Sequence, residues 1–107
     1  MKYLSQEEAI SKVEVVISEV FSVSGVVIIP WDSSCPAIGM RVHEVYVPHV
    51  GVWTDSDLQG LGICAAAERA ILARMVCTGF NDEEQPQEII DADQRLITLM
   101  KDHHETL

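Results

Sequence analysis

The first 21 residues carry a helical pattern of apolar positions. Apolar side chains recur at intervals of three and four residues, namely Ala9, Ile10, Val13, Val16, Ile17, Val20 and Phe21. Ser5 and Glu8 have the spacing of a capping box, in which the serine oxygen accepts from an amide of the first turn and the glutamate reaches back to the serine amide. The pattern predicts an amphipathic helix over residues 6–21.

A change to extended chain follows this helix. Residues 26–29 are all β-branched and are closed by Pro30, which predicts a short buried strand. Valines at positions 42, 45, 47, 50 and 52 also favour extended backbone, but Pro48 lacks the amide that a sheet hydrogen bond needs. We therefore expect residues 40–53 to form either one bent strand or two strands that meet at Pro48.

The segment from about Leu58 to Val76 is apolar on nearly every side. Its charged residues are only Glu68, Arg69 and Arg74. Such a helix must be covered on more than one face. Either the other helices and the sheet enclose it, or a second subunit does, in which case residues 58–76 form a homodimer interface.

A third helix is expected near Pro86, which suits a first turn, and it should run to about Lys101. Its apolar positions follow helical spacing, with Asp93 as the polar exception on that face. The order of elements predicts a single α+β domain over residues 1–107. It comprises an N-terminal amphipathic helix, a small antiparallel sheet of two to three strands, and two helices packing on it.

Composition narrows the class of function. The chain of 107 residues has 17 acidic and 7 basic side chains, and its net charge of -10 repels a phosphate backbone, so we expect no direct nucleic-acid binding. No apolar stretch is long enough for a membrane helix, and the N-terminus turns acidic where a signal peptide would be apolar. The three scattered cysteines suit reduced thiols. We expect a cytoplasmic protein without membrane contact.

The negative charge is concentrated in residues 80–107, where eight acids face two bases. Acidic surfaces accelerate and select association with basic ones, so we expect a basic protein partner, as for an inhibitor, an immunity protein, an antagonist or an adaptor. Tryptophan is also frequent at binding hot spots. The expected contact residues are Asp82, Glu83, Glu84, Glu88, Asp91 and Trp53.

Residues able to do chemistry are few and scattered. His43, His49 and Cys35 offer the imidazole and thiolate groups that bind zinc, but on one unbroken strand the two histidines would be about 20 Å apart. Glu44 follows His43, and sequence neighbours in a strand point to opposite faces. We expect a non-catalytic protein without a cofactor. One alternative is a small metal- or thiol-dependent enzyme that uses these four residues, and the other is a homo-oligomeric structural subunit.

One segment resembles a known family locally. Within residues 60–71, the run Cys-Ala-Ala-Ala-Glu-Arg is similar to the active-site helix of cytidine deaminases, where Cys-Ala-Glu-Arg supplies a zinc thiolate and a catalytic carboxylate. Here Cys64 and Glu68 are four residues apart instead of two, and no Pro-Cys-x-x-Cys run follows. The spacing takes the carboxylate away from a metal-bound water, so the segment is interpreted as an ordinary alanine-rich helix.

Overall fold

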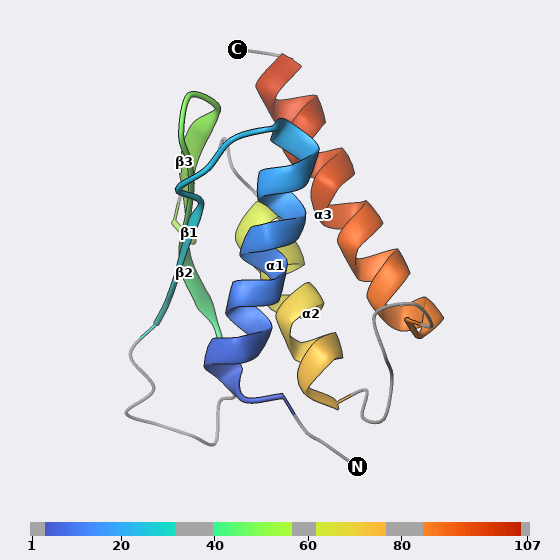
Figure 1. Ribbon diagram of the computed structural model, residues 1–107. Helices are drawn as coiled ribbons and strands as arrows, with labels where there is room; N and C mark the ends of the chain where they lie inside the picture. The colour runs from blue at the N-terminus through green and yellow to red at the C-terminus, as the bar shows by residue number, and fades with distance from the viewer. Residues whose placement is uncertain (1–3, 32–39, 57–61, 77–84, 106–107) are drawn as a thin grey trace.

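The chain folds into two layers, with three helices on one face of a three-stranded antiparallel sheet (Figure 1). The computed structural model describes residues 4–31, 40–56, 62–76 and 85–105. In chain order the elements are α1 (Gln6–Phe21), β1 (Val27–Pro30), β2 (Val42–Val47), β3 (Gly51–Thr54), α2 (Ile63–Val76) and α3 (Gln87–Glu105). The predicted α+β class is confirmed, in its three-strand form.

Helix α1 has the predicted bounds and the predicted N-terminal cap. Ser5 is extended, and its Oγ accepts from the Glu8 amide at 3.1 Å. The glutamate half of the box differs from the prediction, because the Ser5 hydroxyl donates to the Glu8 carboxylate at 3.2 Å. The helix ends at Ser22, whose left-handed backbone lets its amide bond to the Ser18 carbonyl.

The cap at Ser5 gives a first testable prediction. Ser5→Ala leaves the Glu8 amide without its partner, and the expected loss is about 1 kcal/mol in the free energy of unfolding, measured by urea denaturation. Ser11→Ala, an exposed serine within the same helix, is the matched control and is expected to change stability little. Equal losses in the two variants would show that the cap does not stabilise α1.

The sheet has the order β1-β2-β3, and β2 and β3 form a hairpin. Pro48 lies in the hairpin turn. Of the two predicted arrangements, the structure therefore has the one in which two strands meet at Pro48. The Val50 amide donates to the Val47 carbonyl at 3.1 Å, and His49 takes up the positive φ of 66° that the reversal requires. The register pairs Val45 with Trp53, which places both side chains against the helices.

A β-bulge interrupts the pairing of β1 with β2. Ile29 pairs with Glu44, whereas the next residue, Pro30, pairs with Val42, so His43 is the extra residue on β2. Val42 and Val45 on either side are buried, while His43 and Glu44 are both partly exposed. The bulge therefore places two consecutive side chains on the same, helix-free face of the sheet.

Helix α2 lies at the centre of the fold, where it contacts the sheet and both other helices (Figure 1). Its described part is buried along most of its length, through Ile63, Cys64, Ala66, Ala67, Ala70, Ile71 and Arg74. The small alanines allow α1, α3 and the sheet to approach closely from several sides. Within residues 63–76 the other helices and the sheet cover these seven residues, whereas Val76 is 71% exposed. Residues 58–61 of the predicted helix lie outside the described residues.

Helix α3 begins just after Pro86, whose carbonyl accepts from the Ile89 amide at 3.1 Å, and it extends to Glu105. The polar exception at Asp93 has a structural partner on α2. Arg74 is 2% exposed, and its guanidinium donates to both Asp93 carboxylate oxygens at 2.8 Å. No helix in the described part of the chain has the length and apolar character that crossing a bilayer requires.

Candidate protein-interaction surface

The face of the sheet that carries no helix is largely apolar and exposed to solvent. We call it the outer face; its residues are Val27, Ile29, Trp31, His43, Glu44, Tyr46, Val52 and Thr54. Its five large apolar side chains, Val27, Ile29, Trp31, Tyr46 and Val52, are each 40–47% exposed. All three helices pack on the opposite side (Figure 1). Large contiguous apolar patches on a protein surface are typical of interaction sites, so this face is the candidate surface.

The strand register arranges these side chains in rows. Val27, Tyr46 and Val52 form one row across the three strands, and Ile29, Glu44 and Thr54 form the next. Directly paired side chains on one face lie about 5 Å apart at their Cβ atoms, so each row is continuous.

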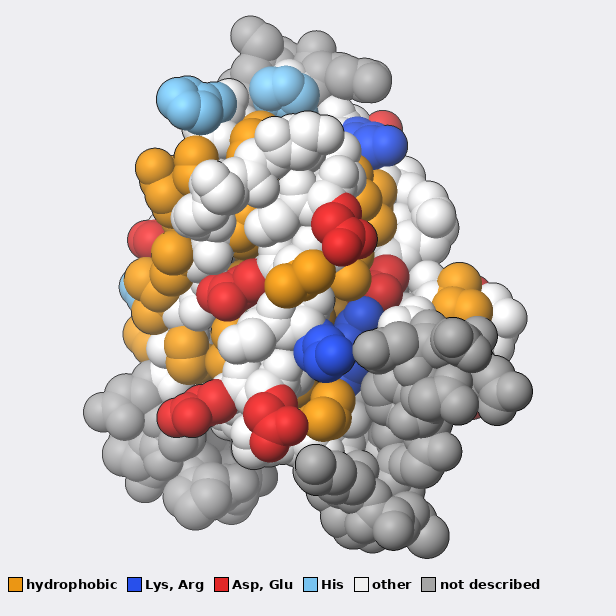
Figure 2. Space-filling view, viewed as in Figure 1, with side chains coloured by type: hydrophobic (Ala, Val, Ile, Leu, Met, Phe, Trp, Pro, Cys, Tyr) orange, Lys and Arg blue, Asp and Glu red, His pale blue; other side chains and the backbone are white. Residues whose placement is uncertain are grey.

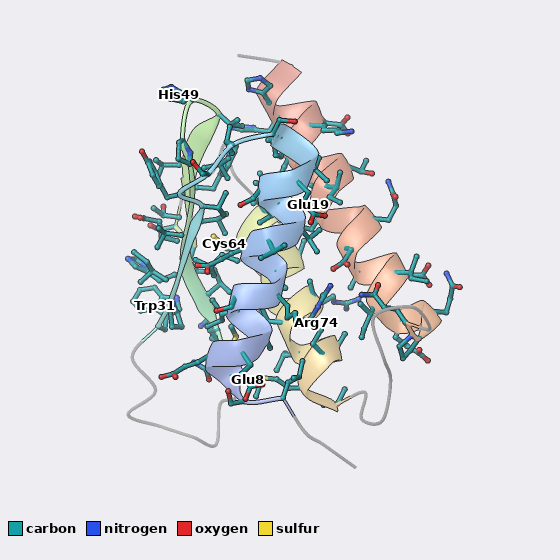
Figure 3. All side chains as sticks on the ribbon, viewed as in Figure 1. Glu8, Glu19, Trp31, His49, Cys64 and Arg74 are labelled. Atoms are coloured by element: carbon teal, nitrogen blue, oxygen red, sulfur yellow. The ribbon has the colours of Figure 1, made fainter. Side chains whose placement is uncertain are left out.

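Trp31 and His43 close the outer face at the end away from the hairpin. Their ring centroids are 4.2 Å apart with the planes tilted by 52°. In Figure 3, Trp31 lies on the helix-free side of the sheet, and His49 lies at the opposite, hairpin end. The Nδ1 atom of His43 is buried and has no hydrogen-bond partner in the described structure.

One backbone amide at the β1 edge of the sheet is already hydrogen-bonded to a side chain. The Ile28 amide on β1 donates to the Glu14 carboxylate of α1 at 2.8 Å. A free amide row at a strand edge is what an incoming strand pairs with. Because Glu14 occupies this donor, a strand added at β1 would have to displace the carboxylate.

The predicted acidic contact residues are only partly described. Asp82, Glu83 and Glu84 lie outside the described residues. Glu88 and Asp91 are exposed near the start of α3, and Asp91 accepts from the Gln87 side chain at 2.8 Å. Both line an open groove of about 520 Å³ between α2 and α3, which is also lined by Arg69 and Arg95. The described lining thus combines two acids and two bases with apolar side chains of both helices.

Trp53 does not lie on a surface. Its side chain is 1% exposed, it packs beneath the sheet near His103, and the ring centroids are 5.7 Å apart. The prediction that Trp53 contacts a partner is corrected by this burial, since β3 alternates and Val52 takes the outward position. The exposed tryptophan is Trp31.

The predicted metal set is not brought together. His43 and His49 lie at opposite ends of β2, and Cys35 is outside the described residues. No group of three potential ligands gathers within the described ranges. The bulge does place His43 and Glu44 on one face, contrary to the expectation from strand alternation, yet no hydrogen bond links their side chains to pair them for acid–base work.

The two residues of the deaminase-like run have structural roles on α2. The Cys64 thiol donates to the Trp53 carbonyl at 3.5 Å, and the Glu68 carboxylate accepts from the Val42 amide at 3.3 Å. Both contacts attach α2 to the sheet. These contacts agree with the interpretation of this segment as an ordinary helix.

Sequence reasoning missed the outer face, although a signal for it was present. Residues 26–29 are apolar at every position, and this pattern predicts a buried strand. In a small antiparallel sheet with all helices on one side, only alternate residues of such a run are covered.

Comparison with protein-family models, with curated proteins and with solved structures found no match for this chain.

Proposed function

We propose that this protein is a non-catalytic protein-binding domain that docks a basic protein partner on the outer face of its sheet. The observation that carries the proposal is the group of five apolar side chains, two of them aromatic, left exposed on one flat face. Aromatic side chains supply large contact areas at low entropic cost, which suits a docking surface.

The charge of the molecule supports a basic partner. Helix α1 carries four acids against one base, and α3 carries five against two, within a net charge of -10. Acidic side chains are spread over the helical side in Figure 2. This field attracts a basic protein over a distance, while the apolar outer face supplies the contact. Such a domain would act as an inhibitor, an immunity protein, an antagonist or an adaptor. From the three scattered cysteines, which suit reduced thiols, we also propose a cytoplasmic location.

A capture experiment with matched variants tests the proposal. Ile29→Ser combined with Val52→Ser makes the outer face polar, whereas Ile90→Ser combined with Val15→Ser changes equally exposed side chains on α3 and α1. We expect the wild type and the helical variant to capture the same basic protein from the source cell. The outer-face variant should capture at least about tenfold less of this protein, since two apolar contacts are removed.

Two results would contradict this function. One is equal capture of the partner by the outer-face variant and the helical variant. The other is capture that does not change when the salt concentration is raised about tenfold, because steering by a net charge of -10 is screened by salt. Melting temperatures of both double variants within a few degrees of the wild type establish that the fold is intact.

A further inference from the structure

The outer face contains one carboxylate near its centre. Glu44 is paired across the strands with Ile29 on one side and Thr54 on the other. Tyr46, two residues further along β2, lies on the same face about 7 Å away along the strand. A charged group is thus surrounded by the apolar side chains that a partner would cover.

Within the described residues Glu44 has no salt bridge. The neighbouring His43 packs its ring on Trp31, and Arg41 is paired with Asp55 at 3.3 Å. A docked partner removes water from this carboxylate, and a desolvated charge is costly unless it is paired. The partner must therefore bring a positive group to this position.

The neighbours of Glu44 favour arginine as that group. A guanidinium binds a carboxylate with two parallel hydrogen bonds and stacks on aromatic rings, and Trp31 and Tyr46 expose 44% and 40% of their surface on this face. Resting on the proposed function, we infer that the outer face binds an arginine-bearing segment of the basic partner. The guanidinium pairs with Glu44, and apolar side chains beside the arginine pack on Ile29 and Val52.

The charges also decide between a foreign partner and a second copy of this chain. A second copy would bring another Glu44 to the same face, on a molecule whose own net charge is -10. Like charges brought together oppose association. At the β1 edge, an added strand would have to displace the Glu14 carboxylate from the Ile28 amide.

Two peptides test the inference directly. One has a single arginine between leucines, and the other has citrulline, which is planar but uncharged, in place of the arginine. Calorimetric titration of the full chain should give binding of the arginine peptide about tenfold tighter than of the citrulline peptide, the size expected for one charge-assisted contact. In Glu44→Gln the two peptides should bind equally, whereas Glu19→Gln, an exposed carboxylate on α1, should keep the tenfold difference.

The outcomes separate this inference from the proposed function. No binding of the arginine peptide at millimolar concentration, or equal binding of both peptides to the wild type, overturns the arginine site. The proposed function still stands if the partner is captured by the wild type and by Glu44→Gln but lost by the Ile29→Ser, Val52→Ser variant. Sedimentation tests whether a second copy of the chain binds to the outer face. A wild type that is dimeric, together with an outer-face variant that is monomeric, would assign the face to a homodimer and overturn the inference.

Discussion

Replacing Asp93 by alanine is expected to lower the free energy of unfolding by about 3–5 kcal/mol, a large part of the stability of a domain of this size. Arg74 is 2% exposed and is held by both Asp93 oxygens at 2.8 Å and by the Ala70 carbonyl at 3.2 Å. Without Asp93 the guanidinium stays between α2 and α3 as a buried charge with no counter-ion. The loss is measured by urea denaturation at neutral pH.

Two further variants establish that the loss comes from the unpaired charge. Asp91→Ala changes an exposed carboxylate on the same helix and should cost less than about 0.5 kcal/mol. Arg74→Met combined with Asp93→Leu replaces the pair by apolar side chains of similar size and should recover most of the stability. If the double variant is as unstable as Asp93→Ala, the pair itself, and not the uncompensated charge, holds α2 and α3 together.

The helices could be predicted from the sequence because their signals are local. Ser5 and Glu8 lie within one turn, and the apolar spacing of α1 is complete over 16 residues, so both ends of this helix matched the prediction. For α3 the start was predicted closely, but the helix continues four residues beyond Lys101, where the chain has no breaking residue. Local rules fix the type of an element better than its end.

The apolar run of residues 26–29 hinted at the candidate surface, but which side chains share that face depends on pairing between distant residues. The bulge that brings Glu44 and His43 to one face exists only in the register of β2 against β1. Likewise, Asp93 is only an odd polar position until α2 and α3 pack and place it opposite Arg74. The predicted contact residues lie mostly in the acidic C-terminal segment, because charge can be counted in the sequence. The uncovered face of a sheet becomes apparent only once the strands and helices are placed.

The two tryptophans show this limit most clearly. Trp31 and Trp53 both end apolar, strand-like runs, and nothing in the sequence separates their roles. The sheet register does so: Trp53 pairs with Val45 and turns toward the helices, at 1% exposure, while Trp31 lies beyond β1 on the outer face at 44%. A substitution at each position should therefore have very different consequences.

Trp53→Ala is expected to destabilise the protein by about 3–5 kcal/mol, because it leaves a large cavity beneath the sheet. The site is shaped around the indole: a Cβ added at Gly51 would lie 3.1 Å from the Trp53 ring. Trp31→Ala removes a half-exposed ring and should cost less than about 1 kcal/mol. Acrylamide should quench the fluorescence of Trp31→Ala weakly, because the remaining Trp53 is buried. It should quench the more conservative Trp53→Phe strongly, because the remaining Trp31 is exposed. Similar losses of stability and similar quenching in the two tryptophan positions would mean that Trp31 is also a core residue, and the outer face would lose its largest contact.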